Sequence, residues 1–379
     1  MHSATRKVNS SKLAKILLVS QLPPPFNGST IMTRTLVSAL QSSGHDVFLV
    51  NKSFSRQSDE IGKAYFRKLL GLPAFLIRLI FGICTHRPKV MLLFLTNRPQ
   101  SFLVDCCVLA IVRIFRVRII CYLHTNGFSE LAARNVIFRE LVKWAFKSSN
   151  LTVTLSKSMT EDVMPFVQVD RTRIIRNCTV ESQSPEPADA LSRFNHKKII
   201  FVSNLIPSKG YVDFLRLFYA LSDEFKELSG VLIGSPTYRD QLEHLRSEVH
   251  SAGFSSTLKI LGYQDHETIS KHLSESSVFV FPSQYAFEAQ PLVLLEALAH
   301  SLPIVGYSSG QISEMISRES GSRLVAPGDL EQLQLEVKAL LSNLDSWTSA
   351  SELALIAFNK DFSADVYRIN WQEAINEVV

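Results

Sequence analysis

The sequence predicts an α/β protein made of two doubly wound domains, each a parallel sheet covered by helices on both faces. A length of 379 residues is enough for two domains with separate cores. Short apolar, β-branched runs alternate with amphipathic stretches throughout, which is typical of parallel strands buried on both faces. Residues 181–198 interrupt this alternation with a polar stretch that contains two prolines and has no periodicity.

The interruption sets the expected domain boundaries. We expect a flexible N-terminus over residues 1–12, an N-terminal domain over 13–182 and a C-terminal domain over 183–362. A final helix over 363–379 can return to the N-terminal domain. Ligands of doubly wound sheets bind outside the carboxyl ends of the strands, so two such domains facing each other would hold a ligand in the cleft between them.

The apolar runs predict the individual strands, and the amphipathic stretches between them predict the helices. In the first half we expect strands at 15–20, 46–50, 90–95, 118–123 and 151–156. The helical patterns between them cover 30–42, 101–115 and 131–147. In the second half we expect strands at 198–203, 230–234, 258–262, 278–282 and 303–307. Its helical patterns cover 210–226, 237–251, 266–275 and 291–300.

Composition excludes several classes of protein. A hydrophobic content of 46% and a charged content of 20% are ordinary for a soluble globular enzyme. The 5 cysteines form no C-x-x-C pair, which disfavours a disulfide framework and a zinc site and indicates a reducing compartment. The basic first residues lack the apolar run of a signal peptide, so we expect a cytoplasmic location.

Charge is distributed unevenly along the chain. Residues 1–182 contain 25 Lys/Arg and 10 Asp/Glu, whereas residues 183–379 contain 15 and 25. The excess of Lys and Arg in residues 1–182 predicts a basic face that binds an anionic partner, but no nucleic-acid-binding motif accompanies these residues. The segment 66–87 mixes large apolar and basic residues, as an interfacial helix at the inner face of a membrane would. A helix packed into its own domain is the alternative, and no apolar run is long enough to span a membrane.

A lysine follows the first strand of the second half. In FVSNLIPSKGYVDFL (201–215), a loop with Pro207 leads to Lys209 and Gly210, and a helix then begins. A helix N-terminus presents free N–H groups and a positive dipole end, so a lysine at this point is placed to bind an anion. A solvated loop lysine is the alternative interpretation of this stretch taken alone.

Two glutamates, Glu288 and Glu296, lie on either side of another expected helix start. The helix would begin at Pro291, because proline is favoured in the first helical turn. The amides of Leu292 and Val293 could then bind phosphate oxygens, and Glu296, about one and a half turns further on, can point back toward them. Carboxylates repel phosphate, so we expect the two glutamates to accept hydrogen bonds from sugar hydroxyls.

Two loops of the first half complete the expected site. The loop SQLPPPFNGST (20–30) contains Gly28, which lets the backbone approach a ligand closely, but it is not the G-x-G-x-x-G of dinucleotide-binding proteins. The segment CYLHTNGFSE (121–130) places His124 at the end of a strand, before Gly127. A structural histidine is the alternative at this position.

These segments together resemble one family. SNLIPSKG (203–210), EAQPLVLLEALAHSLPIVGY (288–307) and the proline-rich first loop are similar to the GT-B glycosyltransferases of family 4, retaining enzymes that use nucleoside-diphosphate sugars. The most specific element is the E-x7-E pair together with the lysine-glycine pair. The resemblance spans nearly the whole chain.

The resemblance implies that residues 13–182 form the acceptor-side domain and residues 183–362 the nucleotide-sugar-binding domain, and it implies a role for each matching residue. Lys209 would bind the donor diphosphate, Glu296 the ribose and Glu288 the donor sugar. His124 would position the reacting sugar, while a phosphate oxygen of the leaving group takes the acceptor's proton. The further positions implied for the donor site or its borders are Gly28, Asn177, Asn204, Leu261, Gly262, Tyr263, Gln290, Pro291 and Leu292, with Pro291 contributing only its carbonyl.

The chain departs from the family pattern at two places. Ser203-Asn204 stands where the family commonly has Gly-Arg, so one phosphate-binding cation is replaced by a neutral donor. Glu288 is followed by Ala-Gln-Pro where the family usually has Gly-Phe-Gly, and Gln290 can alter which sugar hydroxyls are read.

The implied function is metal-independent transfer of a hexose to an acceptor such as a lipid-linked glycan in surface polysaccharide synthesis. No D-x-D sequence occurs, so neither a metal nor another cofactor is expected. A sugar-nucleotide 2-epimerase on the same fold and an inactive nucleotide-sugar-binding protein remain alternatives. Hydrolysis by Glu288 and Glu296 as an acid/base pair would leave Lys209 without a role.

Overall fold

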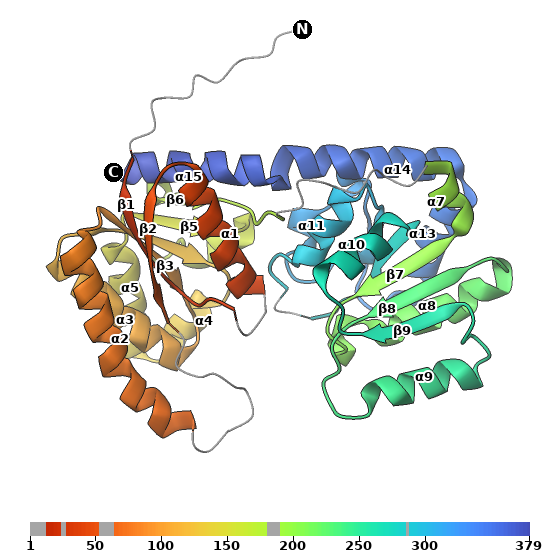
Figure 1. Ribbon diagram of the computed structural model, residues 1–379, viewed down its shortest axis with the longest axis horizontal. Helices are drawn as coiled ribbons and strands as arrows, with labels where there is room; N and C mark the ends of the chain where they lie inside the picture. Colours follow the sequence, from red (N-terminus) through yellow and green to blue (C-terminus); the bar gives the residue numbers. More distant parts are fainter. Residues whose placement is uncertain (1–12, 24–27, 53–63, 180–189, 286–287) are drawn as a thin grey trace, which may run out of the picture. The chain divides into compact units, whose positions relative to one another are not determined.

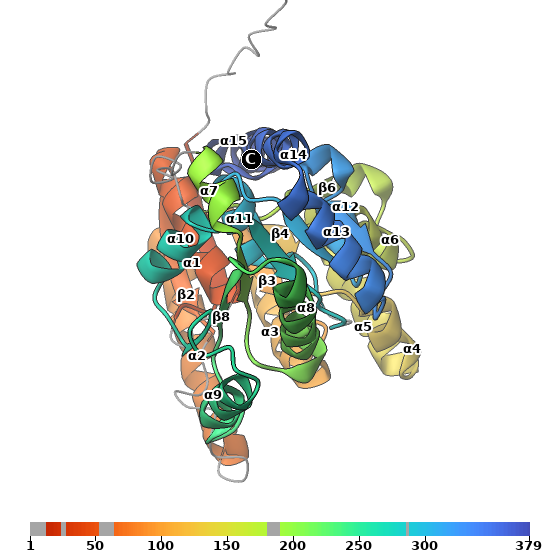
Figure 2. The ribbon, with the colours of Figure 1, turned by 90° about the vertical axis from the view of Figure 1, so that its right-hand side faces the viewer.

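The computed structural model consists of two compact units (Figures 1 and 2). Unit 1 comprises Met1–Asn177 with Asp365–Val379, and unit 2 is Cys178–Ala364. Each unit contains a six-stranded sheet in which every neighbouring pair is parallel, so the predicted fold class is confirmed. The structure describes residues 13–23, 28–52, 64–179, 190–285 and 288–379, with no side chains over 64–70. The N-terminus over 1–12, expected to be flexible, lies outside the described residues.

Unit 1 has the strand order β2-β1-β3-β4-β5-β6. Its strands are β1 (Lys15–Ser20), β2 (Asp46–Asn51), β3 (Val90–Leu95), β4 (Arg118–Leu123), β5 (Leu151–Thr154) and β6 (Thr172–Ile174). Its helices are α1 (Gly28–Ser42), α2 (Ala64–His86), α3 (Pro99–Ile114), α4 (Phe128–Ala133), α5 (Val136–Ser148), α6 (Lys157–Val163), η1 (Val169–Arg171) and α15 (Ala364–Val378). The central strand β3 is buried along its whole length, as expected for a strand covered on both faces.

Helix α15 packs into unit 1 although it ends the chain. The ring of Trp371 meets that of Tyr122 on β4 edge-on, with centroids 4.9 Å apart. His45 Nε2 and the Gln372 side-chain oxygen lie 3.0 Å apart. Apolar and polar contacts therefore both hold the last helix against this sheet.

The helix expected over 131–147 was wrong in extent, because two helices occupy the region. Helix α4 ends at Ala133, and Asn135 adopts an extended backbone and accepts a hydrogen bond from the Phe138 amide at 2.9 Å. Asparagine is a preferred N-cap residue, so a new helix, α5, starts at Val136.

Unit 2 has the strand order β12-β11-β10-β7-β8-β9. Its strands are β7 (Lys198–Val202), β8 (Ser229–Ile233), β9 (Leu258–Gly262), β10 (Val278–Phe281), β11 (Ile304–Tyr307) and β12 (Arg323–Val325). Its helices are α7 (Ala190–His196), η2 (Pro207–Lys209), α8 (Tyr211–Glu224), α9 (Gln241–Ser251), α10 (His266–Ser274), α11 (Leu292–Ala299), α12 (Ile312–Met315), η3 (Arg318–Ser320), α13 (Leu330–Ser342), α14 (Leu344–Ala357) and the π-helix η4 (Phe358–Phe362).

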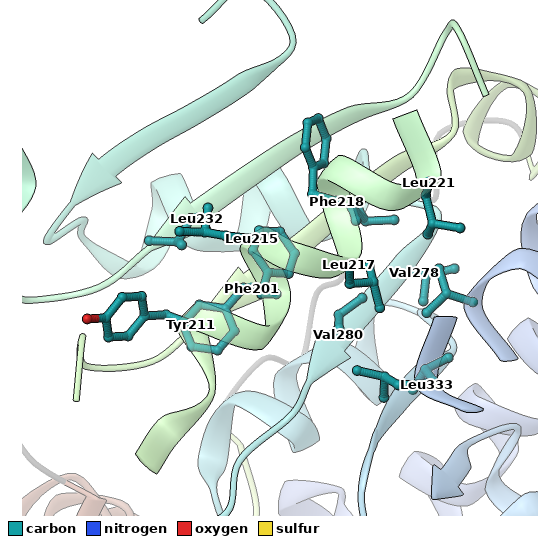
Figure 3. Packing of buried hydrophobic residues seen from close by; sticks show 14 of the residues in the cluster. Phe201, Tyr211, Leu215, Leu217, Phe218, Leu221, Leu232, Val278, Val280 and Leu333 are labelled. Carbon is teal, nitrogen blue, oxygen red and sulfur yellow. The ribbon is translucent and has the colours of Figure 1, made fainter. Parts of the chain in front are cut away.

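Alternate residues of β7 enter two separate cores. Ile199 and Phe201 pack with α8 and α13, whereas Ile200 and Val202 pack with α11, α14 and η4. Figure 3 shows the first of these cores, with α8 side chains such as Phe218 lying over the strands. The two cores hold the sheet rigidly, so the loops at its carboxyl edge leave from fixed points.

The structure corrects the expectation that residues 181–198 are irregular, because Ala190–His196 forms α7. Arg193 of this helix is buried, and its guanidinium donates two bonds to the Ser276 carbonyl and one to the His300 carbonyl. Burial lowers the pKa of Arg193 to about 10. Short polar helices lack the periodicity from which a sequence predicts them, and this one is held by tertiary bonds.

Candidate functional site

The candidate site lies at the carboxyl edge of the unit 2 sheet. Strand β7 has β8 on one side and β10 on the other, so the chain changes direction here and the loops after β7 and β10 meet. The Gln284 amide donates to the Ser208 carbonyl at 2.8 Å. Gly210 has a left-handed backbone, and a Cβ at this position would overlap the carbonyl oxygen of Pro282. Close backbone packing therefore fixes the two loops to each other.

Lys209 and Glu288 form an ion pair across these two loops. Their side chains are 15% and 7% exposed, so both charges are largely removed from solvent. The Ser283 hydroxyl donates to the same oxygen of Glu288 at 3.1 Å, and the Lys209 ammonium lies 4.3 Å from the centre of the Tyr285 ring. The sequence predicted that each residue binds the donor, and the structure brings them into direct contact.

The backbone of Glu288 is held by the segment that follows β11. Its carbonyl accepts a hydrogen bond from the Gln311 amide at 3.1 Å. Gly310 has a left-handed backbone, and a Cβ there would come within 2.7 Å of the same carbonyl. A glycine is thus required at Gly310 for the two segments to approach.

Helix α11 starts at Leu292, so the predicted start at Pro291 was wrong by one residue. Pro291 is the N-cap and keeps an extended backbone, which proline also favours. The amides of Leu292 and Val293 still belong to the first turn. Glu296 follows in the same helix and is half-buried.

The other residues predicted to line the donor site lie in loops of unit 2 or close to them. Asn204 follows β7 and is exposed, while Gln290 is buried between Glu288 and α11. Leu261 and Gly262 are the last two residues of β9, and Gly262 has a left-handed backbone. Tyr263, the next residue, is 69% exposed.

Sequence reasoning missed a polar cluster beside Lys209. The Asp213 carboxylate, on the first turn of α8, accepts hydrogen bonds from the Tyr307 hydroxyl at 3.1 Å and from the Gln284 amide group at 3.3 Å. Burial and the charge of Asp213 raise the pKa of Tyr307. No motif announces this contact, because it joins the ends of β11, β10 and α8 only in the folded sheet.

In unit 1, His124 follows β4 and lies among aromatic rings. Its ring stacks on Phe94 at 4.7 Å with an interplanar angle of 8°, and it meets Tyr122 edge-on at 4.2 Å. Burial lowers the pKa of His124 to about 3, so the imidazole is neutral at physiological pH. Among the described residues, its buried Nε2 has no hydrogen-bond partner.

The amides that follow His124 are already occupied. The Asp162 carboxylate accepts hydrogen bonds from Gly127, Phe128 and Ser129 at 2.9, 2.7 and 3.0 Å. This side chain neutralises the positive end of α4, so α4 offers no phosphate site. Gly28, the remaining predicted residue, begins α1 and is exposed, while residues 24–27 of its loop lie outside the described residues. Asn177 is buried, and the Tyr122 hydroxyl donates to its side-chain oxygen at 3.3 Å.

A buried ion pair on the same edge of unit 1 was also missed. Lys52, after β2, donates to Asp105 Oδ1 at 2.6 Å and to the Phe94 carbonyl at 3.2 Å. Asp105 Oδ2 accepts from the amide and hydroxyl of Thr96 at 3.0 and 2.9 Å. Burial raises the pKa of Asp105, and Lys52 opposes that rise. The available signal was a carboxylate inside the apolar run at 102–115.

Metal binding has no visible basis in the part of the chain that the structure describes. No group of three or more His, Cys, Asp or Glu side chains there could hold a metal ion. The charged groups that the structure describes at the unit 2 edge include Lys209, Arg216 and the carboxylates of Glu288 and Asp213.

Two parallel doubly wound units with this edge define the GT-B class of fold. The family model described as "Glycosyl transferases group 1" matches residues 184–353, and the model described as "Glycosyltransferase Family 4" matches residues 26–180. The chain belongs to the family 4 glycosyltransferases.

Individual relatives are distant. The chain is 29% identical over 207 residues to an exopolysaccharide phosphotransferase of Streptomyces coelicolor, a match that covers 54% of this chain but only 21% of that protein. Among solved structures, sucrose-phosphate synthase of Thermosynechococcus elongatus has a TM-score of 0.72 at 16% identity, covering 96% of this chain and 98% of that one. HepE of Anabaena in complex with UDP-glucose has a TM-score of 0.70 at 16% identity, covering 96% and 99%.

Proposed function

We propose that this protein is a retaining glycosyltransferase that moves a sugar from a nucleoside-diphosphate sugar to an acceptor. The observation that carries the proposal is the Lys209–Glu288 pair at the carboxyl edge of β7 and β10. A cation for phosphate and a carboxylate for hydroxyls stand side by side there, next to the first turn of α11. A nucleotide sugar has the same sequence of groups, a diphosphate next to a polyhydroxylated ring.

Donor binding would exchange the partners of this pair. The diphosphate would take the place of the Glu288 carboxylate as the acceptor of the Lys209 ammonium. Glu288 would then be free to accept hydrogen bonds from the sugar hydroxyls, while the Ser283 hydroxyl still holds it. The cost of burying these two charges is offset before the donor binds, because each charge has the other as its partner.

The remaining donor contacts follow from position. The amides of Leu292 and Val293 and the positive end of α11 would offset phosphate charge that Lys209 alone does not neutralise. Glu296, one and a half turns further along the helix, would hold the ribose hydroxyls. Gln290, Leu261 and Tyr263 would contribute to the choice of sugar and nucleotide base.

In the reaction, the acceptor oxygen forms a bond to the anomeric carbon on the face from which the diphosphate departs. The bond between that carbon and the phosphate oxygen breaks, and a phosphate oxygen of the leaving group takes the acceptor's proton. Lys209 and the α11 amides stabilise the charge that grows on the diphosphate, an electrostatic contribution that needs no metal. His124, neutral because of its burial, would position the sugar through a hydrogen bond rather than remove a proton.

The relatives suggest which substrates to test first. A UDP-glucose complex of HepE makes UDP-glucose the first donor, and the exopolysaccharide phosphotransferase makes a surface glycan or its lipid-linked precursor the first acceptor class. We propose that the acceptor is of this kind, bound on the unit 1 side.

We also propose that unit 1 associates with an anionic membrane surface through α2. This helix buries Phe75, Leu79 and Ile83 but leaves Ile77 and Phe81 exposed at 66% and 67%. Helices that are apolar on both sides are normally covered on both sides. The excess of basic residues in the first half favours an anionic lipid surface as the cover. Of the helices in the described part of the chain, none has the length and hydropathy of a membrane-spanning segment.

The test of the donor site is calorimetry with UDP combined with turnover of UDP-glucose. Glu296→Ala should weaken UDP binding about tenfold or more, since charge-assisted hydrogen bonds contribute about 1.5–3 kcal/mol. Glu331→Ala, an exposed glutamate on α13, is the matched control and should bind like the wild type. Proton NMR of the transferred sugar should show the anomeric configuration of the donor. Tight UDP binding without transfer, across donors and acceptors, would contradict the enzyme assignment.

The membrane proposal has its own test. Co-sedimentation with phosphatidylglycerol vesicles should occur at low salt and weaken at high salt. The double variant Ile77→Ser/Phe81→Ser should lose it, whereas Ile356→Ser, an exposed apolar residue of unit 2, should not. Absence of binding at low salt would remove the proposal.

A further inference from the structure

Three consecutive residues in the loop after β10 contact both members of the Lys209–Glu288 pair. The Ser283 hydroxyl donates to Glu288 Oε1 at 3.1 Å, and the centre of the Tyr285 ring lies 4.3 Å from the Lys209 ammonium. Gln284 lies between these two residues in the chain. We call Ser283, Gln284 and Tyr285 the clamp strip. Its position determines where the carboxylate and the ammonium are held.

Gln284 attaches the clamp strip to the segment that carries Lys209. Its side-chain amide group donates to Asp213 Oδ2 at 3.3 Å, and its backbone N–H donates to the Ser208 carbonyl at 2.8 Å. Ser208 is the residue before Lys209, whereas Asp213 lies on the first turn of α8, just beyond it. The strip is therefore bonded to this segment on both sides of the lysine.

Tyr307 holds the Asp213 carboxylate in place. The Tyr307 side chain, at the end of β11, is fully buried, and its hydroxyl donates to Asp213 Oδ2 at 3.1 Å. The Asp213 side chain is only 15% exposed, so solvent weakens these bonds to the carboxylate little. Arg216 lies 3.7 Å from the other carboxylate oxygen but is 66% exposed, and such an ion pair contributes little. The buried end of a strand thus sets the direction of the carboxylate.

Stabilisation of its own helix is the alternative role for Asp213. An acidic residue in the first turn commonly stabilises a helix by its charge near the N-terminus. The N-cap of α8 is Gly210, however, and it makes no side-chain cap bond. The hydrogen bonds that the structure describes for the Asp213 carboxylate come from β11 and from the clamp strip. These bonds join three loops of the candidate site rather than the turns of α8.

We propose that Asp213 is a positioning residue for the donor site, which, held by Tyr307, fixes the clamp strip and through it the Lys209–Glu288 pair. Its effect on sugar transfer rests on the proposed glycosyltransferase function. When Asp213 is lost, the strip can shift, and the contacts to Lys209 and Glu288 loosen together. Misplacing a binding group by about 1 Å can lower a reaction rate by about a hundredfold, so a residue that touches no substrate can still control transfer.

The first experiment measures the contact without any substrate. The Lys209 side chain is 15% exposed, so its acetylation by acetic anhydride, followed by mass spectrometry of the full chain, reports how firmly it is held. Asp213→Asn should speed acetylation of Lys209 about threefold to tenfold, the loss of one hydrogen bond. Asp223→Asn, an exposed residue on the last turn of α8, is the matched control and should have no effect. Equal rates in the two variants would overturn the proposal.

Tyr307→Phe tests the same contact with a milder change. It removes a single hydroxyl and keeps the buried ring, so it remains informative if Asp213→Asn does not fold. Acetylation of Lys209 should again be faster than in the wild type, because the Asp213 carboxylate loses the donor that directs it. A rate equal to that of the wild type would show that Tyr307 does not act on the pair.

The second experiment measures transfer from UDP-glucose. Asp213→Asn should lower the rate about tenfold or more. The exchange variant Asp213→Asn/Gln284→Glu restores a bond between an amide and a carboxylate at the same net charge, and it should recover most of the rate. An exchange variant as slow as Asp213→Asn would overturn the positioning role. A wild type that neither binds UDP nor transfers sugar would instead contradict the proposed function, and the acetylation rates would still decide whether Asp213 holds the pair.

Discussion

The ammonium of Lys209 is held by the carboxylate of Glu288, although the two residues lie 79 positions apart and both are largely buried. Each is therefore positioned before any ligand arrives. Such preorganisation removes the entropy cost of orienting two long side chains when a ligand binds. Replacing either side chain alone would leave the other as a buried charge that has lost its ion-pair partner. A double-mutant cycle can therefore measure the interaction between the two residues.

The first prediction concerns this cycle. Lys209→Met should lower the affinity for UDP by about tenfold to a hundredfold and destabilise the fold by about 1–3 kcal/mol, because the Ser283 hydroxyl is then the one described partner left to the Glu288 carboxylate. Glu288→Gln should chiefly lower the rate of transfer. Calorimetry, initial rates and urea unfolding measure the three effects.

The double variant Lys209→Met/Glu288→Gln gives the contrasting outcome. Its stability should be closer to that of the wild type than the sum of the single variants, since no unpaired charge remains buried. Its UDP affinity should stay as low as that of Lys209→Met. Additive stability losses would show that the two side chains do not interact in solution.

The second prediction concerns His124 and pH. Its pKa is about 3 in the folded protein against an ordinary value of 6.5, so between these values the unfolded chain binds the extra proton. The contribution of His124 to the free energy of unfolding is therefore complete above pH 6.5. It decreases as the pH falls, by about 2 kcal/mol at pH 5. His124→Gln should lose less stability between pH 7 and pH 5 than the wild type does, as measured by urea unfolding.

His250→Gln, an exposed histidine of α9, is the control and should keep the acid sensitivity of the wild type. The His124 variant should also transfer sugar more slowly while binding UDP normally. An identical loss of stability in wild type and His124→Gln would show that this imidazole is protonated in the folded state.

The third prediction compares two glycines with similar backbones. Gly210 and Gly253 both have left-handed conformations, with φ of 88° and 84°. Gly253→Ala has open space around the new methyl group and should cost only the backbone strain of about 1–2 kcal/mol. Gly210→Ala must in addition displace the Pro282 carbonyl, which separates the loops that carry Lys209 and Glu288.

Gly210→Ala should therefore lower both the melting temperature and the affinity for UDP, whereas Gly253→Ala should lower only the melting temperature. Thermal unfolding with and without UDP distinguishes them, because a ligand stabilises only a protein that still binds it. Equal UDP-induced stabilisation of the two variants would contradict the loop contact.

The fourth prediction concerns Arg193. Its guanidinium donates three hydrogen bonds to the carbonyls of Ser276 and His300, which close the ends of α10 and α11. Arg193→Met would leave those buried carbonyls without donors and should cost at least about 3 kcal/mol. Chemical denaturation measures this loss, and Arg239→Met, an exposed arginine, should change stability little.

Most strands and the positions of the motifs could be predicted from the amino-acid sequence. Strands β1, β3 and β4 have the bounds that the apolar runs predicted, because a strand buried on both faces leaves a continuous local signal. The bounds of β9 were also predicted, although it is buried at alternate positions. The three-residue strands β6 and β12 show no such continuous apolar signal in the sequence, because each contains an arginine. Loops after strands were also predictable, and with them the placement of Lys209, Glu288 and His124 at carboxyl edges.

Which of these side chains contact one another depends on the folded structure. The partner of Lys209 is Glu288, the start of α4 is taken by Asp162, and Lys52 pairs with Asp105. Each contact joins segments that are distant in the sequence and that the strand order brings together, so no local periodicity indicates it. Hydrophobic periodicity is a property of neighbouring residues, whereas the pairing of buried charges depends on which strands lie side by side. For that reason the sequence could place the residues of the candidate site but could not pair them.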